Sequence, residues 1–127
     1  MKLKLSQLVK AQPALMDLAS KQLIAKTAFK IGRNLKIIAS EMELYEARRI
    51  ALAQKYGTLN AANNQYRFDN GAGEKFVAEL NDLRETEVEN NIMPIALADL
   101  ADLEMTAHDM AQLDWLIEDD QDVTPSP

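Results

Sequence analysis

The chain has 127 residues, a length that builds one domain around a single hydrophobic core. Apolar residues make up 47% of it, which excludes a disordered chain, and it has no cysteine, which excludes disulfides and thiolate metal sites. The net charge of −6 hides a gradient: five bases and no acid lie between Leu18 and Ser40, whereas fourteen acids and one base follow from Glu79 onward. Because the acidic half would repel phosphates, nucleic acid is not an expected partner, and no apolar run predicts a membrane span.

The N-terminal residues predict a short strand followed by a helix. Lysine and leucine alternate over residues 1–5, a pattern typical of a strand. Ser6 is the expected N-cap of a helix over residues 6–19, and Pro13 should kink or restart that helix because proline lacks a backbone donor. The same stretch shows no signal peptide, since Gln12, Pro13 and Asp17 interrupt its apolar character.

The stretch from about residue 22 to residue 56 contains no proline and predicts one long helix, the element around which the fold is organised. Apolar residues recur on it every three or four positions, as in a heptad seam, with Arg49 interrupting the series. Such a helix spans about 50 Å, more than the roughly 36 Å of a compact domain this size, so the seam should extend to a second chain. The sequence therefore predicts a homo-oligomer, most simply a dimer, with Arg49 paired to a carboxylate of another helix or subunit or snorkelling at the bundle end. The seam comprises Ile24, Ile31, Leu35, Ile38, Met42, Tyr45 and Arg49, with Ala28 between the first two.

The second half of the chain has weaker sequence patterns, which predict several short elements. Residues 58–65 are small and polar and predict a loop, and residues 66–68 form either a short strand or a pair of anchoring aromatics. A turn at residues 69–71 precedes a predicted helix over 73–86, residues 87–97 predict an irregular or edge strand, and Thr106 opens a last helix over 106–118. Residues 119–127 predict an acidic mobile tail beyond a single domain of residues 1–118.

These elements predict an α+β fold that is mostly α. The long central helix is accompanied by three shorter helices and a small sheet of two or three strands. Residues 1–5 should pair with 87–97, because Lys2 and Lys4 suit Glu87 and Glu89 as cross-strand neighbours.

No residue pattern predicts an enzyme, a metal site or a cofactor. His108 stands alone without ligand spacing, and the Gly71–Gly73 pair lacks the third glycine of a dinucleotide loop. Glu41, Glu43 and Glu46 crowd one helix beside arginines, an arrangement more typical of a salt-bridged surface than of paired catalytic carboxylates.

The strongest candidate binding surface is a basic stretch of the long helix. It is either a solvated helix face, neutralised by the acidic half of the chain, or an anion-recognition site for phosphate or for acidic groups of a partner. Its residues are Lys26, Lys30, Arg33, Asn34 and Lys36.

Three segments carry a family resemblance: Lys26–Asn34, the Glu41–Gly57 stretch with its charged residues and Leu-x-x-Lys-Tyr-Gly ending, and Leu113–Glu118. Together they make most of the chain similar to a family of small proteins of tailed bacteriophages and prophages. The resemblance implies a viral origin and a bacterial host cytoplasm or virion as location, and it supplies no functional residues.

Two functions are expected from these observations. The first is a non-enzymatic, oligomeric structural or assembly adaptor that contacts other phage or host proteins. The second is a counter-defence binder that captures a small anionic signalling nucleotide, with the bases holding phosphate and an aromatic ring stacking on the nucleobase.

Overall fold

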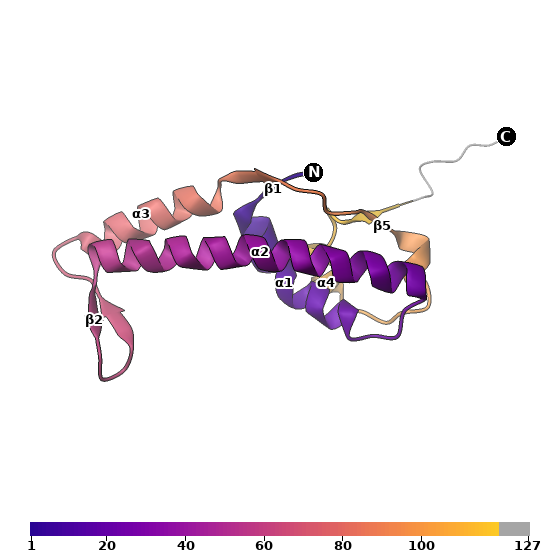
Figure 1. Ribbon diagram of the computed structural model, residues 1–127, viewed down its shortest axis with the longest axis horizontal. Helices are drawn as coiled ribbons and strands as arrows, with labels where there is room; N and C mark the ends of the chain where they lie inside the picture. The colour runs from indigo at the N-terminus through magenta and orange to yellow at the C-terminus, as the bar shows by residue number, and fades with distance from the viewer. Residues whose placement is uncertain (120–127) are drawn as a thin grey trace.

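A computed structural model describes residues 1–119 and confirms a mostly helical α+β fold. The long helix α2 (Ala25–Tyr56) runs along the whole molecule without a break, and the other elements are arranged along it (Figure 1). Its 32 residues correspond to about 48 Å of helix. The helix ends at Gly57, whose N–H donates to the Ala53 carbonyl at 2.8 Å. A side chain at Gly57 would not fit, because its Cβ would lie 2.8 Å from a ring carbon of Phe68.

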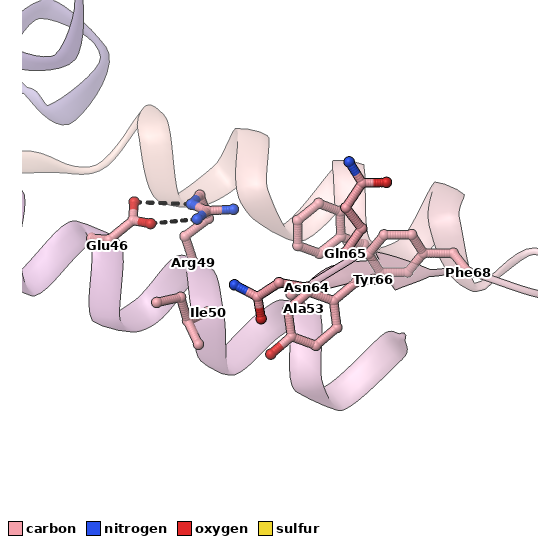
Figure 2. Close-up of a pocket in the computed structure, with 9 residues that line it drawn as sticks. Glu46, Arg49, Ile50, Ala53, Asn64, Gln65, Tyr66 and Phe68 are labelled. Atoms are coloured by element: carbon pink, nitrogen blue, oxygen red, sulfur yellow. Dashed lines mark hydrogen bonds and ion pairs between the residues drawn. The ribbon is translucent and has the colours of Figure 1, made fainter. Parts of the chain in front are cut away.

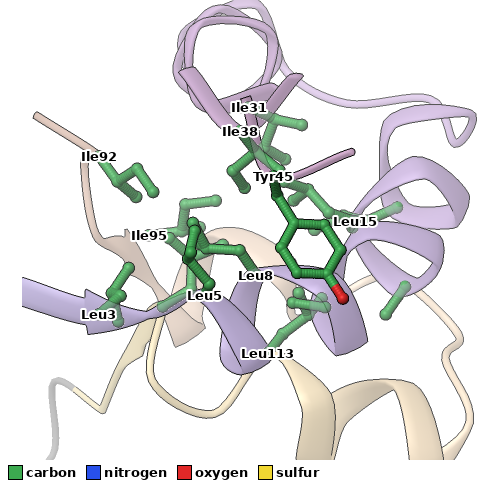
Figure 3. Close-up of a cluster of buried hydrophobic side chains, with 14 of the residues drawn as sticks. Leu3, Leu5, Leu8, Leu15, Ile31, Ile38, Tyr45, Ile92, Ile95 and Leu113 are labelled. Atoms are coloured by element: carbon green, nitrogen blue, oxygen red, sulfur yellow. The ribbon is translucent and has the colours of Figure 1, made fainter. Parts of the chain in front are cut away.

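The hydrophobic core lies where α1 (Leu5–Ala19) packs against α2 and against the short helix α4 (Ala107–Gln112). Leucines at helical spacing give α1 one continuous buried face, and α2 contributes Ile31 and Ile38 from the opposite side (Figure 3). Helix α1 continues through Pro13, which is exposed, and its N-cap is Lys4 rather than the expected Ser6. The fully buried apolar side chains are Leu8, Leu15, Leu18, Ile31, Ile38, Ile95, Leu113 and Leu116.

The C-terminal half of α2 packs against α3 (Ala72–Arg84), which corresponds to the helix predicted over residues 73–86. Tyr45 is buried between these helices, and its hydroxyl accepts a hydrogen bond from Arg84 Nε at 2.9 Å. Gly71 caps α3 in a left-handed conformation, with φ at +80°, which confirms the turn expected at residues 69–71.

Within residues 1–119, three separate two-stranded sheets replace the single small sheet of two or three strands that was predicted. Strand β1 (Lys2–Lys4) pairs antiparallel with β4 (Glu87–Glu89), and the register places Lys2 opposite Glu89 and Lys4 opposite Glu87, as predicted. The hairpin of β2 (Thr58–Asn60) and β3 (Gln65–Arg67) lies where a loop was expected over residues 58–65, so that expectation is wrong. It extends from the end of α2 away from the rest of the molecule (Figure 1).

The prediction of a last helix over residues 106–118 is wrong beyond Gln112, because the end of this segment is a strand of the third sheet. Strand β5 (Ile95–Ala96), followed by a 3₁₀ turn η1 (Leu97–Leu100), pairs in parallel with β6 (Ile117–Glu118). Thr106 caps α4 as predicted, accepting a hydrogen bond from the Asp109 N–H at 3.1 Å, but the helix ends at Gln112. The chain ends its helix there because Leu113 and Leu116 are both fully buried and bring residue 117 to β5. The predicted tail lies outside the described residues apart from Asp119.

Most of the predicted seam packs inside the chain's own core. Ile31, Ile38 and Tyr45 are buried, and Leu35 and Met42 are partly buried against the same cluster. Ile24 does not belong to the seam, because it precedes the first turn of α2 and is 61% exposed. The predicted seam therefore offers no continuous apolar surface to a second chain.

Candidate functional site

The side of α2 that faces away from the core forms the first candidate site, which we call the outer face of α2. Its residues lie within about 40° of the direction opposite Ile31 on a helical wheel, so they form one stripe along the helix. Two large apolar side chains stand out on it: Phe29 is 63% exposed and Leu44 is 65% exposed. Between residues 29 and 51, the outer face comprises Phe29, Arg33, Lys36, Ser40, Leu44, Ala47 and Ala51, all of them exposed.

The predicted basic residues divide between this face and its border. Lys26, Arg33 and Lys36 are exposed at the N-terminal half of α2, and Lys30 is half-buried. The Arg33 guanidinium lies over the Phe29 ring, 5.2 Å from its centroid, which is within the range of a cation–π contact. The structure thus brings four of the five predicted residues to one end of the helix.

Asn34 does not belong to the basic surface, because its side chain is completely buried. Its Nδ2 donates to the Met93 carbonyl at 2.9 Å, and its Oδ1 accepts from the Met93 N–H at 2.8 Å. The Asn34 amide therefore makes the two hydrogen bonds with the Met93 backbone that a neighbouring strand would otherwise make. Asn34 has a role in the fold, and the expectation that it contributes to anion binding is wrong.

A shallow groove runs beside the basic residues where α2 meets the Met93 segment. Arg33 and Lys36 lie on one side of it, Asn91 and Met93 on the other, and Ile37 contributes apolar surface. Its volume is about 440 Å³. The groove offers two cationic groups, one amide and an apolar floor to a small anion.

A second cleft, which we call the hairpin cleft, lies between the C-terminal half of α2, the β2–β3 hairpin and α3. It has a volume of about 640 Å³. Figure 2 shows Glu46 and Arg49 at one end of it and the side chains of Asn64, Gln65 and Tyr66 at the other. The rings of Phe68 and Phe76 complete the wall, stacked with their centroids 4.8 Å apart.

Arg49 pairs within its own helix rather than with another helix or subunit. Its Nε donates to Glu46 Oε2 at 2.9 Å, and its Nη2 donates to the other carboxylate oxygen (Figure 2). This hydrogen bonding lowers the pKa of the Glu46 carboxyl and raises the pKa of the Arg49 guanidinium. The pairing is local because Glu46 lies three residues earlier, on the same side of α2.

The hairpin residues of this cleft were not predicted as a site. Residues 60–64 are small and polar, so no periodicity marks the fold of the hairpin. The alternation of Tyr66 and Phe68 was the available signal, and it was interpreted as a strand or as anchoring aromatics. Tyr66 lies on β3 opposite Leu59, and Phe68 follows the strand and packs on α3.

Within residues 1–119, no group of three or more histidine or acidic side chains is placed to hold a metal ion. None of the helices described there has the length and apolarity that crossing a membrane requires. Comparisons with models of protein families, with curated proteins and with solved structures found no match.

Proposed function

We propose that this chain is a phage-encoded, non-enzymatic adaptor that binds other phage or host proteins and associates with itself. The observation that carries the proposal is the outer face of α2, where Phe29 and Leu44 are each more than 60% exposed on one helix stripe. A single exposed apolar residue is ordinary, but a stripe that combines two large apolar side chains with small residues and two bases suits a docked helix. The phage origin, and with it a location in the bacterial host cytoplasm or the virion, rests on the resemblance of three sequence segments.

The test compares two substitutions of exposed apolar residues. Leu44→Glu changes the outer face, whereas Val77→Glu changes a residue of α3 that is 52% exposed and lies off that face. Mass spectrometry of purified virions should detect the wild-type chain, or a tagged copy should recover a phage assembly protein from infected cells. We expect Val77→Glu to retain this association and Leu44→Glu to lose it. Absence of the chain from virions together with failure to recover any specific partner would contradict the proposal.

A second candidate function, capture of a small anionic nucleotide, is favoured by the groove beside Arg33 and Lys36. Two cations beside an apolar floor suit a phosphate attached to a ring system, and a second subunit would deepen the groove. A nucleotide at a hundred times its dissociation constant should stabilise the fold by about 2.7 kcal/mol in a thermal-shift assay with cyclic and ADP-ribose nucleotides. We expect the combined Arg33→Ala and Lys36→Ala substitutions to remove that shift and Lys75→Ala, a change on α3, to leave it. If no nucleotide shifts the melting temperature, this function is excluded.

A further inference from the structure

The outer face of α2 has a geometry that suits a second helix lying along it. Phe29, Ser40 and Ala51 follow each other at intervals of 11 residues, which is three helical turns, so the stripe runs nearly parallel to the helix axis. Between the two large apolar residues the stripe carries Ser40 together with the bases Arg33 and Lys36, and beyond Leu44 it carries the small residues Ala47 and Ala51. Small side chains at these places let a second helix approach closely.

The charges on this face are separated along the helix. Arg33 and Lys36 lie in its N-terminal half, and Glu43 lies on its border in the C-terminal half, exposed like the two bases. No ion pair of Arg33, Lys36 or Glu43 occurs among those described for residues 1–119. The face therefore carries opposite charges at positions that a reversed copy of itself would bring together.

We propose that a second copy of this chain covers the outer face, with the two α2 helices antiparallel about a two-fold axis at Ser40. This inference rests on the proposed function, because it names the partner in self-association. In this arrangement, a residue a given number of positions before Ser40 lies at the same level along the helix axes as the residue the same number of positions after it in the second copy. Residues at the centre of the stripe meet at that level, whereas a residue on a border meets a residue of the same border at a neighbouring level.

The residues along the centre of the stripe then fit one another in size. Ser40 meets Ser40 of the second copy at the axis. Arg33 lies over Ala47 of the second copy, and Phe29, the largest exposed side chain of the face, lies over Ala51. Each large side chain thus meets a small one, which is the pattern of well-packed helix pairs.

The two borders of the stripe are also complementary. A two-fold axis across the interface brings the same border of both helices together, so Lys36 lies beside Glu43 of the second copy and can form an ion pair. On the other border, Leu44 meets Ile37 of the second copy, a residue that is partly buried by its own core and leaves some apolar surface. Next to Ser40, one border is therefore charged and the other apolar. Toward the ends of the stripe, Lys26 comes beside Lys55 of the second copy, whose charge is already paired with Glu79 in its own chain.

A parallel pair of α2 helices would lose this complementarity. It would place Lys36 opposite Lys36 and Arg33 opposite Arg33, and like charges at close range oppose association. The antiparallel arrangement separates these bases and gives Lys36 an acidic neighbour. The charge pattern therefore selects the antiparallel dimer.

The first test exchanges the charges of the proposed ion pair. Light scattering after size exclusion should give twice the 14.2 kDa mass of one chain for the wild-type protein at micromolar concentration. Lys36→Glu should raise the dimer dissociation constant about tenfold, which corresponds to about 1.4 kcal/mol, because it places like charges together. Combining it with Glu43→Lys should restore the dimer. A monomeric wild-type protein, or a double variant no better than Lys36→Glu alone, would overturn the proposal.

The second test uses the absence of native cysteine and remains valid if a charge variant folds poorly. Under oxidation, Ser40→Cys should cross-link to itself, because small residues at the axis bring two Cα atoms within the roughly 4.4–6.8 Å of a disulfide. Ala47→Cys alone should not cross-link, since Ala47 and its copy would lie about 21 Å apart along the axis, but a mixture of Ala47→Cys and Arg33→Cys should. Self-cross-linking of Ala47→Cys would indicate a parallel pair, and no cross-linking at Ser40 would exclude this face. Either result overturns the dimer, while virion and pull-down data test the adaptor function separately.

Discussion

Replacement of Asn34 tests the most specific structural claim about α2. Its amide makes two hydrogen bonds with the backbone of Met93, at 2.9 and 2.8 Å, from a side chain with no solvent exposure. Asn34→Ala removes both partners and leaves the Met93 N–H and carbonyl without them. Each unsatisfied buried group costs about 1–3 kcal/mol, and because Met93 is only partly buried we expect the lower part of the summed range, a loss of about 2–4 kcal/mol from the free energy of unfolding.

The assay is thermal and urea unfolding followed by circular dichroism. For a chain of this length, that loss should lower the melting temperature by roughly 8–15 °C. The matched control is Asn91→Ala, an exposed asparagine of the same segment, which should change the free energy of unfolding by at most about 0.5 kcal/mol. Equal effects of the two substitutions would refute the reasoning.

Asn34→Asp extends the test to pH. A buried aspartic acid has a raised pKa, and its protonated form can both donate to and accept from the Met93 backbone, as the amide does. Below the unfolded pKa of about 4, the free energy of unfolding of this variant should therefore be close to the wild-type value. As the pH rises through the folded pKa, the variant should lose stability relative to the wild type. A stability difference that does not change with pH would contradict burial of this side chain.

Three further predictions concern other contacts. The Lys4–Glu85 ion pair, 2.7 Å long, lowers the pKa of the Glu85 carboxyl through a hydrogen bond. The stability that this pair contributes is therefore present above the pKa of Glu85 in the unfolded chain and is lost as the pH falls through its pKa in the folded chain. NMR titration should show the lowered pKa of Glu85, and Lys4→Met should return it to its ordinary range. Tyr45→Phe removes the hydroxyl that accepts from Arg84 and should cost about 1 kcal/mol by urea unfolding, and an unchanged midpoint would argue against that bond. Gly57→Ala should cost about 1–3 kcal/mol, because the new methyl would lie 2.8 Å from a ring carbon and 2.9 Å from a backbone oxygen, and a neutral effect on the melting temperature would contradict the close approach of the hairpin.

The elements predicted correctly are those with a strong local pattern. The long helix follows from a three-to-four-residue apolar period, interrupted only at Arg49, in a stretch without proline, and Gly57 marks its end. Pairing of β1 with β4 follows from alternating lysines that match two glutamates, a signal that fixes both partner and register. In each case a short pattern carries the signal, within one segment for the helix and within each of two distant segments for the strand pair.

The elements predicted wrongly depend on contacts between distant segments. Leu113 and Leu116 have helical spacing, yet residues 113–116 form a turn because the Leu116 carbonyl accepts from the Ile95 N–H and guides β6 onto β5. The same holds for Asn34, which the sequence presents as one more polar residue beside a basic stretch. Only the position of Met93 shows that its amide satisfies a buried backbone.

The candidate site was partly predictable for the same reason. Helical periodicity places Lys26, Arg33 and Lys36 together, whereas the use of the apolar seam depends on which elements cover it. Since α1 and α3 cover Ile31, Ile38 and Tyr45, the large apolar side chains that α2 leaves most exposed are Phe29 and Leu44 on the opposite stripe. A sequence pattern identifies an apolar face but does not say whether the same chain already buries it.

The most direct measurement of the central claim, that the outer face of α2 binds a second copy in antiparallel orientation, is a spin–spin distance by double electron–electron resonance. The chain has no cysteine, so Gln54→Cys gives one label per chain near the exposed end of α2. In the antiparallel dimer centred on Ser40, the two labels are separated along the helix axes by 28 residues, or about 42 Å. We expect a distance distribution centred near this value; a distance below about 20 Å, expected for parallel helices about 8–10 Å apart, or the absence of any dipolar signal would contradict the account.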